Sequence, residues 1–415
     1  MRKGDFLKRT KRSGKLSLRW VKPIIILLLS LSISPLCLQA QDTWIKEYDP
    51  FENNAWQIYH PEDLVIVENG YVLNCRYEYD INPPHMEIVK KGFIMKVDKS
   101  GNEQWLNSFG LYSISTALLK TSDGGFLESH FYDMYPYPSS LTKIDTNGNI
   151  VWTKSYDSFR PYSMDSTSDG NIIIGGSDWL KGKHSIRKVT QSGEIIWSKT
   201  YDNFGILYAI IQSSNGGYIA TGITDGDSGF PDIFIIRIDE NGNELWTRSA
   251  DYNDLKDRGS TLTETKDGSF IIGGSIDSKD GRSALLIKVD GLGKTLNQKI
   301  IEGQDIFGYR TIFTLDDGTI IGGYPQVNKF DENLNEIWTV DYMLKASEKG
   351  IKQTNDEGLI FHTSKDSVFQ IIKTNSMGKY IFKESTSDDN SFAFTDTSGT
   401  QSSTSIKETS KKCRD

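Results

Sequence analysis

Short apolar runs alternate with polar, glycine-containing segments along most of the chain, from Trp44 to about residue 384. The runs Phe93–Val97, Phe234–Ile238 and Leu285–Val289 are rich in β-branched, aromatic and leucine residues, which favour strands. No apolar repeat with the period of a helix extends over a comparable length. The pattern therefore predicts an all-β protein built from many short strands.

A first kind of turn, in which a polar residue precedes a glycine, separates neighbouring apolar runs. Asp-Gly and Asn-Gly are strong hairpin signals, because a tight turn needs a positive φ that glycine and asparagine tolerate. The turn occurs seven times, at spacings of 54, 46, 46, 52, 50 and 40 residues. Its glycines are Gly70, Gly124, Gly170, Gly216, Gly268, Gly318 and Gly358.

A second kind of turn has the form Asp-x-x-Gly-x-x-x-Trp. Degenerate copies of this motif carry Asn297 in the Trp position, Leu334 in the Gly position and Phe382 in the Trp position of the last copy. Because the tryptophan returns once per unit, we expect each indole to pack between neighbouring units with its N–H bonded to the backbone. The tryptophans assigned this structural role are Trp44, Trp105, Trp152, Trp197, Trp246 and Trp338.

The two turns divide each unit into four strands: before and after the Gly turn, before the Asp turn, and through the tryptophan. Four-stranded units at intervals of about 45 residues indicate a β-propeller. Seven Gly turns predict seven four-stranded blades, with the strand at Trp44 closing the ring against the last blade. Eight blades are the alternative, since eight Trp-type strands are present if those at Trp44 and Phe382 both count.

The two ends of the chain differ from the repeat. Residues 1–22 carry nine Lys/Arg and one acid, an apolar run to residue 36 follows, and Ala40 stands at the expected cut. Residues 1–40 thus read as a secretory signal peptide, with an uncleaved anchor as the alternative. The apolar run is shorter than the roughly 20 residues that a membrane helix needs. We assign residues 41–387 to the propeller and 388–415 to a disordered Ser/Thr-rich tail.

Export would place the protein in the periplasm, at the cell surface or outside the cell. The whole chain has a net charge of −8; removing residues 1–40 takes Lys+Arg from 47 to 38 and Asp+Glu from 55 to 54, giving −16. An acidic surface of this size argues against nucleic acid and anionic membranes as partners. We expect a monomer whose partner is a glycan or another protein.

The strand order predicts two different rims. The Gly and Asp turns share one rim, which we call the turn rim, and the longer connections share the opposite one, which we call the variable rim. Irregular loops on a rigid scaffold usually carry recognition. Exposed aromatics beside Arg could stack on sugar rings or bind extended peptides. The candidate ligand-binding residues are Tyr77, Tyr79, Tyr132, Tyr135, Tyr137, Trp179, Arg160 and Arg310.

A candidate calcium loop lies on the variable rim. Asp225 and Asp227 alternate ahead of Gly229, and Asp232 could add a ligand. A complete calcium loop needs more oxygens and a bidentate acid, so we expect no cofactor, with calcium as the alternative. The five histidines lack metal-ligand spacing, and no motif for a nucleophile, a phosphate or a dinucleotide is present. A glycosidase pair among the rim carboxylates stays open.

The Asp-x-x-Gly-x-x-x-Trp turn resembles the repeat of quinoprotein-like propellers, which include pyrroloquinoline-quinone dehydrogenases and outer-membrane assembly scaffolds. The phrase Tyr218-Ile219-Ala220-Thr221-Gly222 after a Gly turn looks more like uncharacterised secreted propellers of Bacteroidetes-type bacteria. The match covers most of residues 44–384 through a few positions per unit. It implies the fold and says little about activity. A quinone dehydrogenase would also need calcium ligands and usually a vicinal cysteine pair, and no adjacent cysteines occur here.

The sequence therefore favours a non-catalytic propeller that binds a glycan or protein through its variable rim. A carbohydrate-active enzyme using rim carboxylates and an envelope assembly scaffold are the alternatives.

Overall fold

The computed structural model describes residues 43–50, 57–80, 87–133, 138–226, 229–252, 255–278, 281–302, 310–323, 326–341, 350–365 and 368–379. The chain divides into two units, 1–40 and 41–415, and all described residues belong to the second. The predicted signal peptide, the predicted tail and the candidates Tyr135, Tyr137 and Asp227 lie outside them. No helix of the described part is long and apolar enough to cross a membrane.

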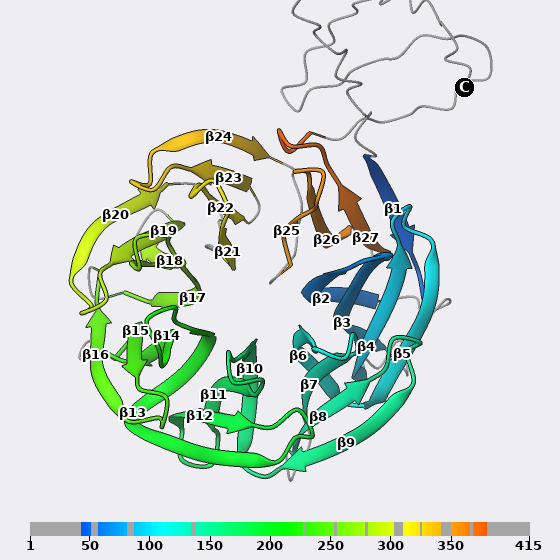
Figure 1. Ribbon diagram of the computed structural model, residues 1–415, viewed down its shortest axis with the longest axis horizontal. Helices are drawn as coiled ribbons and strands as arrows, with labels where there is room; N and C mark the ends of the chain where they lie inside the picture. Colours follow the sequence, from blue (N-terminus) through cyan, green and yellow to red (C-terminus); the bar gives the residue numbers. More distant parts are fainter. Residues whose placement is uncertain are drawn as a thin grey trace, which may run out of the picture. The chain divides into compact units, whose positions relative to one another are not determined.

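The described strands of the second unit form seven antiparallel sheets, which lie around a common centre (Figure 1). Each sheet has four strands, with the first strand innermost. The long β13 bends from the third sheet into the fourth and serves as the last strand of one and the first of the other.

The first three sheets are β2 (Gln57–Val67), β3 (Gly70–Asp80), β4 (Ile88–Asp98) and β5 (Glu103–Leu111); β6 (Ser113–Lys120), β7 (Phe126–Tyr132), β8 (Ser139–Ile144) and β9 (Ile150–Tyr156); and β10 (Phe159–Ser166), β11 (Ile172–Asp178), β12 (Lys183–Val189) and β13 (Ile195–Gln212). The next three are β13, β14 (Tyr218–Asp225), β15 (Pro231–Ile238) and β16 (Glu244–Ala250); β17 (Asp257–Glu264), β18 (Phe270–Ser278), β19 (Gly281–Val289) and β20 (Thr295–Ile301); and β21 (Thr311–Thr314), β22 (Ile320–Gly323), β23 (Gln326–Phe330) and β24 (Glu336–Asp341). The seventh is β25 (Lys352–Gln353), β26 (Leu359–Lys365), β27 (Val368–Lys373) and β1 (Trp44–Tyr48).

The seventh sheet joins the two ends of the described chain. Strand β1 pairs antiparallel with β27, with Trp44 opposite Lys373 and Tyr48 opposite Phe369. The strand at Trp44 thus completes the last sheet, as the sequence predicts. This strand order confirms the all-β propeller.

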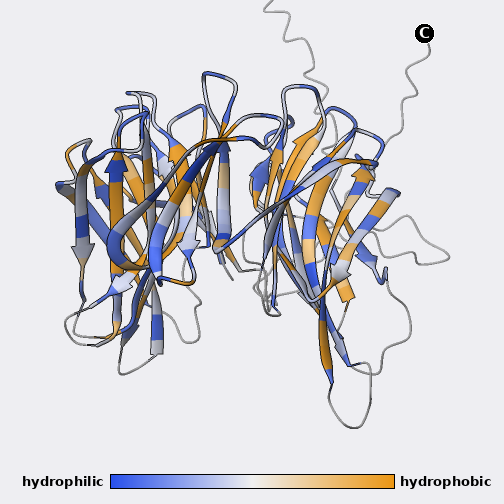
Figure 2. Ribbon diagram, turned by 90° about the horizontal axis from the view of Figure 1, so that it is seen from below, coloured by the Kyte–Doolittle hydropathy of each residue, from blue (hydrophilic) through white to orange (hydrophobic). Residues whose placement is uncertain are grey.

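Among the described residues, seven hydrophobic clusters hold the ring together, and each fills the seam between two neighbouring sheets. Successive residues of one strand serve opposite seams: Tyr218 packs toward the third sheet and Ile219 toward the fifth. Both faces of each sheet are therefore covered, which explains why the strands read as continuous apolar runs rather than alternating ones. Seen from the side, apolar residues concentrate in the strands and polar residues in the described turns (Figure 2).

The recurring tryptophan and glycine belong to one contact between neighbouring sheets. A Cβ placed on Gly148, whose φ is +90°, would lie 2.7 Å from the ring of Trp105. The indole Nε1–H of Trp105 donates to the carbonyl of Thr146 in the same turn (3.3 Å). The same packing joins Trp44 to Gly101, Trp152 to Gly193, Trp197 to Gly242 and Trp246 to Gly293.

Two repeat copies that depart from the Asp-x-x-Gly-x-x-x-Trp pattern contact each other. Asn297, which occupies the Trp position, donates its amide N–H to the carbonyl of Asn333 (2.6 Å). Asn333 directly precedes Leu334, which occupies the Gly position with a φ of +65° and a buried side chain. The large residue Leu334 therefore replaces glycine in the one described turn whose partner position carries Asn297 instead of tryptophan.

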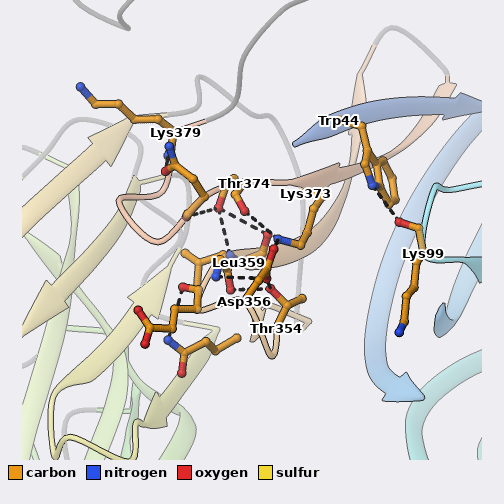
Figure 3. A network of polar contacts seen from close by, with 12 residues as sticks. Trp44, Lys99, Thr354, Asp356, Leu359, Lys373, Thr374 and Lys379 are labelled. Carbon is orange, nitrogen blue, oxygen red and sulfur yellow. Dashed lines mark hydrogen bonds and ion pairs between the residues drawn. The ribbon is translucent and has the colours of Figure 1, made fainter. Parts of the chain in front are cut away.

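The Gly turns carry a second repeated contact on the turn rim. In the seventh sheet the Nζ of Lys373 donates to both carboxylate oxygens of Asp356 (2.9 Å each), and Thr354 also donates to Asp356 (Figure 3). In the second sheet, Lys143 and Thr121 donate equivalent hydrogen bonds to Asp123, and these bonds lower the pKa of Asp123 to about 2. The equivalent ion pairs are Lys188–Asp169, Lys288–Asp267 and Lys329–Asp317.

Candidate functional site

The innermost strands share an irregularity near the middle of their length. In five sheets the pairing of the first and second strands skips one residue, which makes a β-bulge. Each skipped residue lies eight positions before the glycine of its Gly turn. The five residues are Glu62, Thr116, Tyr162, Tyr208 and Ser260.

The same count gives Arg310 for the sixth sheet. In the seventh sheet Glu357 takes the place of the turn glycine, with a φ of +63°, and the count from it falls outside the described residues. We call Arg310 and the five bulge residues the inner ring positions.

Glycines on the second strands make room for three of these bulges. A Cβ on Gly176 would lie 2.0 Å from the carbonyl oxygen of Arg160, and one on Gly222 would lie 1.8 Å from that of Ile206. Gly274 meets the carbonyl of Arg258 in the same way, at 1.9 Å. The Gly-Gly and Thr-Gly phrases of the sequence thus allow the first strand to bulge against the second.

A cavity of about 290 Å³ lies where the inner ring positions meet. Six of the seven sheets contribute to it, the sixth through Arg310, which directly precedes β21. The five bulge residues lie near the middle of the paired part of their first strands. The lining residues are Glu62, Arg76, Ile114, Thr116, Phe131, Tyr162, Tyr208, Arg258, Ser260 and Arg310.

Aromatic rings form one part of this lining. The ring of Tyr162 lies 6.0 Å from Phe131 and meets Tyr208 edge-on at 5.5 Å between centroids. Burial raises the pKa of Tyr162 to about 12, so its hydroxyl stays protonated at neutral pH. The two tyrosines therefore offer apolar ring surface together with hydroxyl groups that can donate or accept hydrogen bonds, and Phe131 packs beside them.

Three arginines form another part of the cavity lining. Arg76 is paired within the first sheet, 3.2 Å from Glu78 and 3.7 Å from Glu62. The guanidinium of Arg258 lies over the ring of Tyr208 at 5.4 Å and forms no ion pair with a described residue. Among the described lining residues Glu62 is the one carboxylate, against Arg76, Arg258 and Arg310.

Three of the candidates from the sequence lie at or beside this cavity. Arg310 lines it directly. The guanidinium of Arg160 lies 4.9 Å from the ring of Phe131 and 5.6 Å from the ring of Trp179. Arg160 and Trp179 therefore lie next to the lining residue Phe131, just outside the cavity. The structure thus brings Arg160, Trp179 and Arg310 to one region.

Other candidates face elsewhere. Tyr77 is 1% exposed, stacked between Tyr59 (4.9 Å) and Tyr79 (4.8 Å), and the prediction that it presents an exposed ring is wrong. Strand β3 continues to Asp80, so Tyr77 stays within the sheet and packs into the seam with the seventh sheet. Tyr79 is half-buried against that cluster. Tyr132 meets His130 edge-on at 5.3 Å and is not part of the lining.

The candidate calcium loop is described only in part. Asp225 is exposed and Asp232 is 8% exposed at the start of the partner strand β15. Within the described ranges, no group of three or more His, Cys, Asp or Glu residues is arranged to hold a metal ion. Asp227 lies outside those ranges, so calcium binding stays a prediction.

Most of the lining was not predicted, because the candidate residues were sought in the loops. Glu62, Thr116, Tyr208 and Ser260 lie within the innermost strands, and no shared residue type or local motif marks them. The available signal was their constant distance of eight residues from the turn glycine. That signal becomes meaningful only once the bulge shows that this position faces the centre.

Comparisons with known proteins give a fold likeness and no family. No protein-family model matches the chain, and no curated protein matches it in sequence. The quinoprotein-like relationship therefore stays a prediction. Similar solved structures include a protein of unknown function from Bacteroides caccae, with a TM-score of 0.41 and 12% identity, covering 59% of this chain and 88% of that one.

Two further structures cover more of the chain. The Dos1 propeller has a TM-score of 0.49 and 11% identity, covering 78% of this chain and 97% of that one. The Neurospora crassa Pan2 WD40 domain has a TM-score of 0.46 and 10% identity, covering 76% of this chain and 89% of that one. At these scores the likenesses carry no argument about function, and the propeller fold rests on the strand order and ring closure described above.

Proposed function

We propose that this chain is an exported, non-catalytic propeller that binds a glycan in the cavity formed by its inner ring positions. The observation that carries the proposal is the convergence of side chains from six sheets on one cavity of about 290 Å³. A cavity near 300 Å³ is at the small end of the range for ligand sites, which suits one or two sugar rings of a longer chain.

The lining supports a sugar over an extended apolar peptide. Tyr162 and Tyr208 present half-buried rings for the apolar face of a pyranose, beside the buried ring of Phe131, while Ser260 supplies a hydroxyl group. A glycosidase would need two carboxyl groups about 5–10 Å apart, and the described lining offers one, Glu62. The composition of the cavity therefore favours binding over hydrolysis.

The test is capture on a glycan array by the purified protein and by the Tyr162→Ala/Tyr208→Ala variant. We expect the variant to lose capture, since aromatic stacking provides much of the contact. Phe204→Ala is the matched control, because Phe204 is an aromatic residue 50% exposed outside the cavity lining. Equal capture by all three proteins, or capture by none, would contradict the proposal.

A further inference from the structure

The cavity carries a charge of the opposite sign to the rest of the protein. The chain is acidic, with a formal net charge of −8. Its described cavity lining contains three arginines and one carboxylate. A recess in which one sign of charge is in excess concentrates ligands of the other sign, so the site is suited to an anion.

The arginines are not equivalent in this respect. Arg76 is held by Glu62 and Glu78 inside the first sheet, so its charge is largely balanced by protein carboxylates. Arg258 is exposed, and its guanidinium is positioned over the Tyr208 ring rather than by an acid. A guanidinium stacked in this way keeps its N–H edge available for a planar, two-oxygen partner. Arg258 is thus the group best placed to receive an anion.

The aromatic and cationic groups are also joined directly. Tyr208 contacts both Tyr162 and Arg258, so a ring lying on the tyrosines would have a charged substituent beside the guanidinium. A sugar ring that bears a carboxylate combines these two features in one small unit. A neutral sugar would offer no charged group to Arg258, which forms no ion pair with a described residue.

We infer that the ligand is an acidic glycan whose sugar carboxylate is bound by Arg258 in the cavity that Arg310 also lines. The inference rests on the proposed function and specifies its ligand class. Glu62 opposes the anion, because it is the one carboxylate of the described lining and only 5% exposed. The affinity of the cavity for an anion therefore depends on attraction by Arg258 and repulsion by Glu62.

The test compares matched probes with the full-length protein: an oligogalacturonide, the neutral oligogalactoside of equal length and a sulfated oligogalactoside. We expect the oligogalacturonide to bind at least about tenfold more tightly than the neutral oligomer. Raising the salt concentration should narrow that gap, because screening weakens the attraction between charges that are partly exposed. The carboxylate should also be preferred over the sulfate ester, since it is planar and matches the guanidinium edge.

Three variants give effects of different sign. Arg258→Gln should weaken oligogalacturonide binding about tenfold and leave weak binding of the neutral oligomer unchanged. Glu62→Gln should strengthen oligogalacturonide binding several-fold. Arg248→Gln is the control: it removes the same charge from the exposed outer strand β16, and we expect no change.

Two results would overturn the inference and leave the proposed function standing. In the first, the acidic and neutral oligomers bind equally well and both lose binding in Tyr162→Ala/Tyr208→Ala. In the second, the oligogalacturonide and the sulfated oligogalactoside bind equally well. Binding of no saccharide at all would overturn the proposed function and the inference together. A loss in Arg258→Gln with no gain in Glu62→Gln would contradict the role given to the cavity charge.

Discussion

The turn rim and the cavity use the same repeat in opposite ways. On the turn rim one residue type returns in sheet after sheet, as in the Trp105–Gly148 contact and the Lys143–Asp123 ion pair. At the inner ring positions the backbone geometry returns but the residue changes, from glutamate through tyrosine to arginine. The first region is built mostly of repeated contacts, and the second of different side chains on a repeated backbone bulge.

The difference separates stability from recognition. The tryptophan–glycine contact joins neighbouring sheets at five seams, so we expect the loss of one copy to weaken the fold. An inner ring residue projects from a bulge that the backbone already makes, so its side chain can change without altering the strands. The predictions below test this separation, beginning with the largest expected change in stability.

The largest effect is expected for Gly148→Ala. Both the positive φ and the Trp105 ring oppose a side chain there, and together they should cost about 3 kcal/mol of the free energy of unfolding. Gly170→Ala is the matched control, with a φ of +78° and no atom within 4 Å, so only the backbone strain of about 1 kcal/mol applies. Urea unfolding of both variants measures the difference. Equal losses would show that the tryptophan contact adds nothing.

A smaller effect is expected for Lys288→Met. The Nζ of Lys288 donates to Asp267 (3.0 Å) and to the carbonyl of Glu332 in the next sheet (3.1 Å), and the side chain is 8% exposed. Losing these bonds should cost about 1–2 kcal/mol. Lys154→Met removes the more exposed pair with Glu194 and should change the stability by less than about 0.5 kcal/mol. The reverse order of the two variants would contradict the account.

A pH-dependent effect is expected at Asp257, between the fourth and fifth sheets. Burial raises the pKa of this carboxyl to about 7, and nearby Asp251, Asp232 and Asp277 add to the shift. Between about pH 4 and 7 the folded protein keeps a proton that the unfolded chain releases, so this group lowers the stability as the pH rises.

Asp257→Asn removes that dependence. The stability of the variant relative to the parent protein should therefore increase from pH 4 to 7 and stay constant above that range. His184 and His362, whose pKa values burial lowers to about 4, act in the opposite direction in both proteins and cancel in the difference. Thermal unfolding at a series of pH values tests this, and a difference independent of pH would refute it.

The smallest effect on stability is expected at the cavity itself. Arg258 is exposed and contacts the Tyr208 ring, so Arg258→Gln should change the free energy of unfolding by less than about 0.5 kcal/mol. Urea unfolding is again the measurement. A loss comparable to that of Gly148→Ala would mean that the inner ring residues hold the fold.

The fold could be predicted from the sequence because its signals are local and repeated. A glycine at positive φ, such as Gly148, and a tryptophan at a fixed distance identify the turns without knowledge of the three-dimensional arrangement. The cavity could not be predicted in the same way, because Glu62 and Arg310 are 248 residues apart and meet only when the ring closes. The candidate Tyr77 failed for a related reason: the length of its strand, which buries the ring, cannot be read from the aromatic pattern.

The most direct test of the separation is to measure stability and glycan capture together for Gly148→Ala and Tyr208→Ala. The account predicts that Gly148→Ala unfolds at a lower urea concentration but still captures the glycan while it is folded. It predicts that Tyr208→Ala retains most of its stability and loses capture. The opposite assignment, with capture lost in the folded Gly148→Ala protein and retained in Tyr208→Ala, would contradict the central claim.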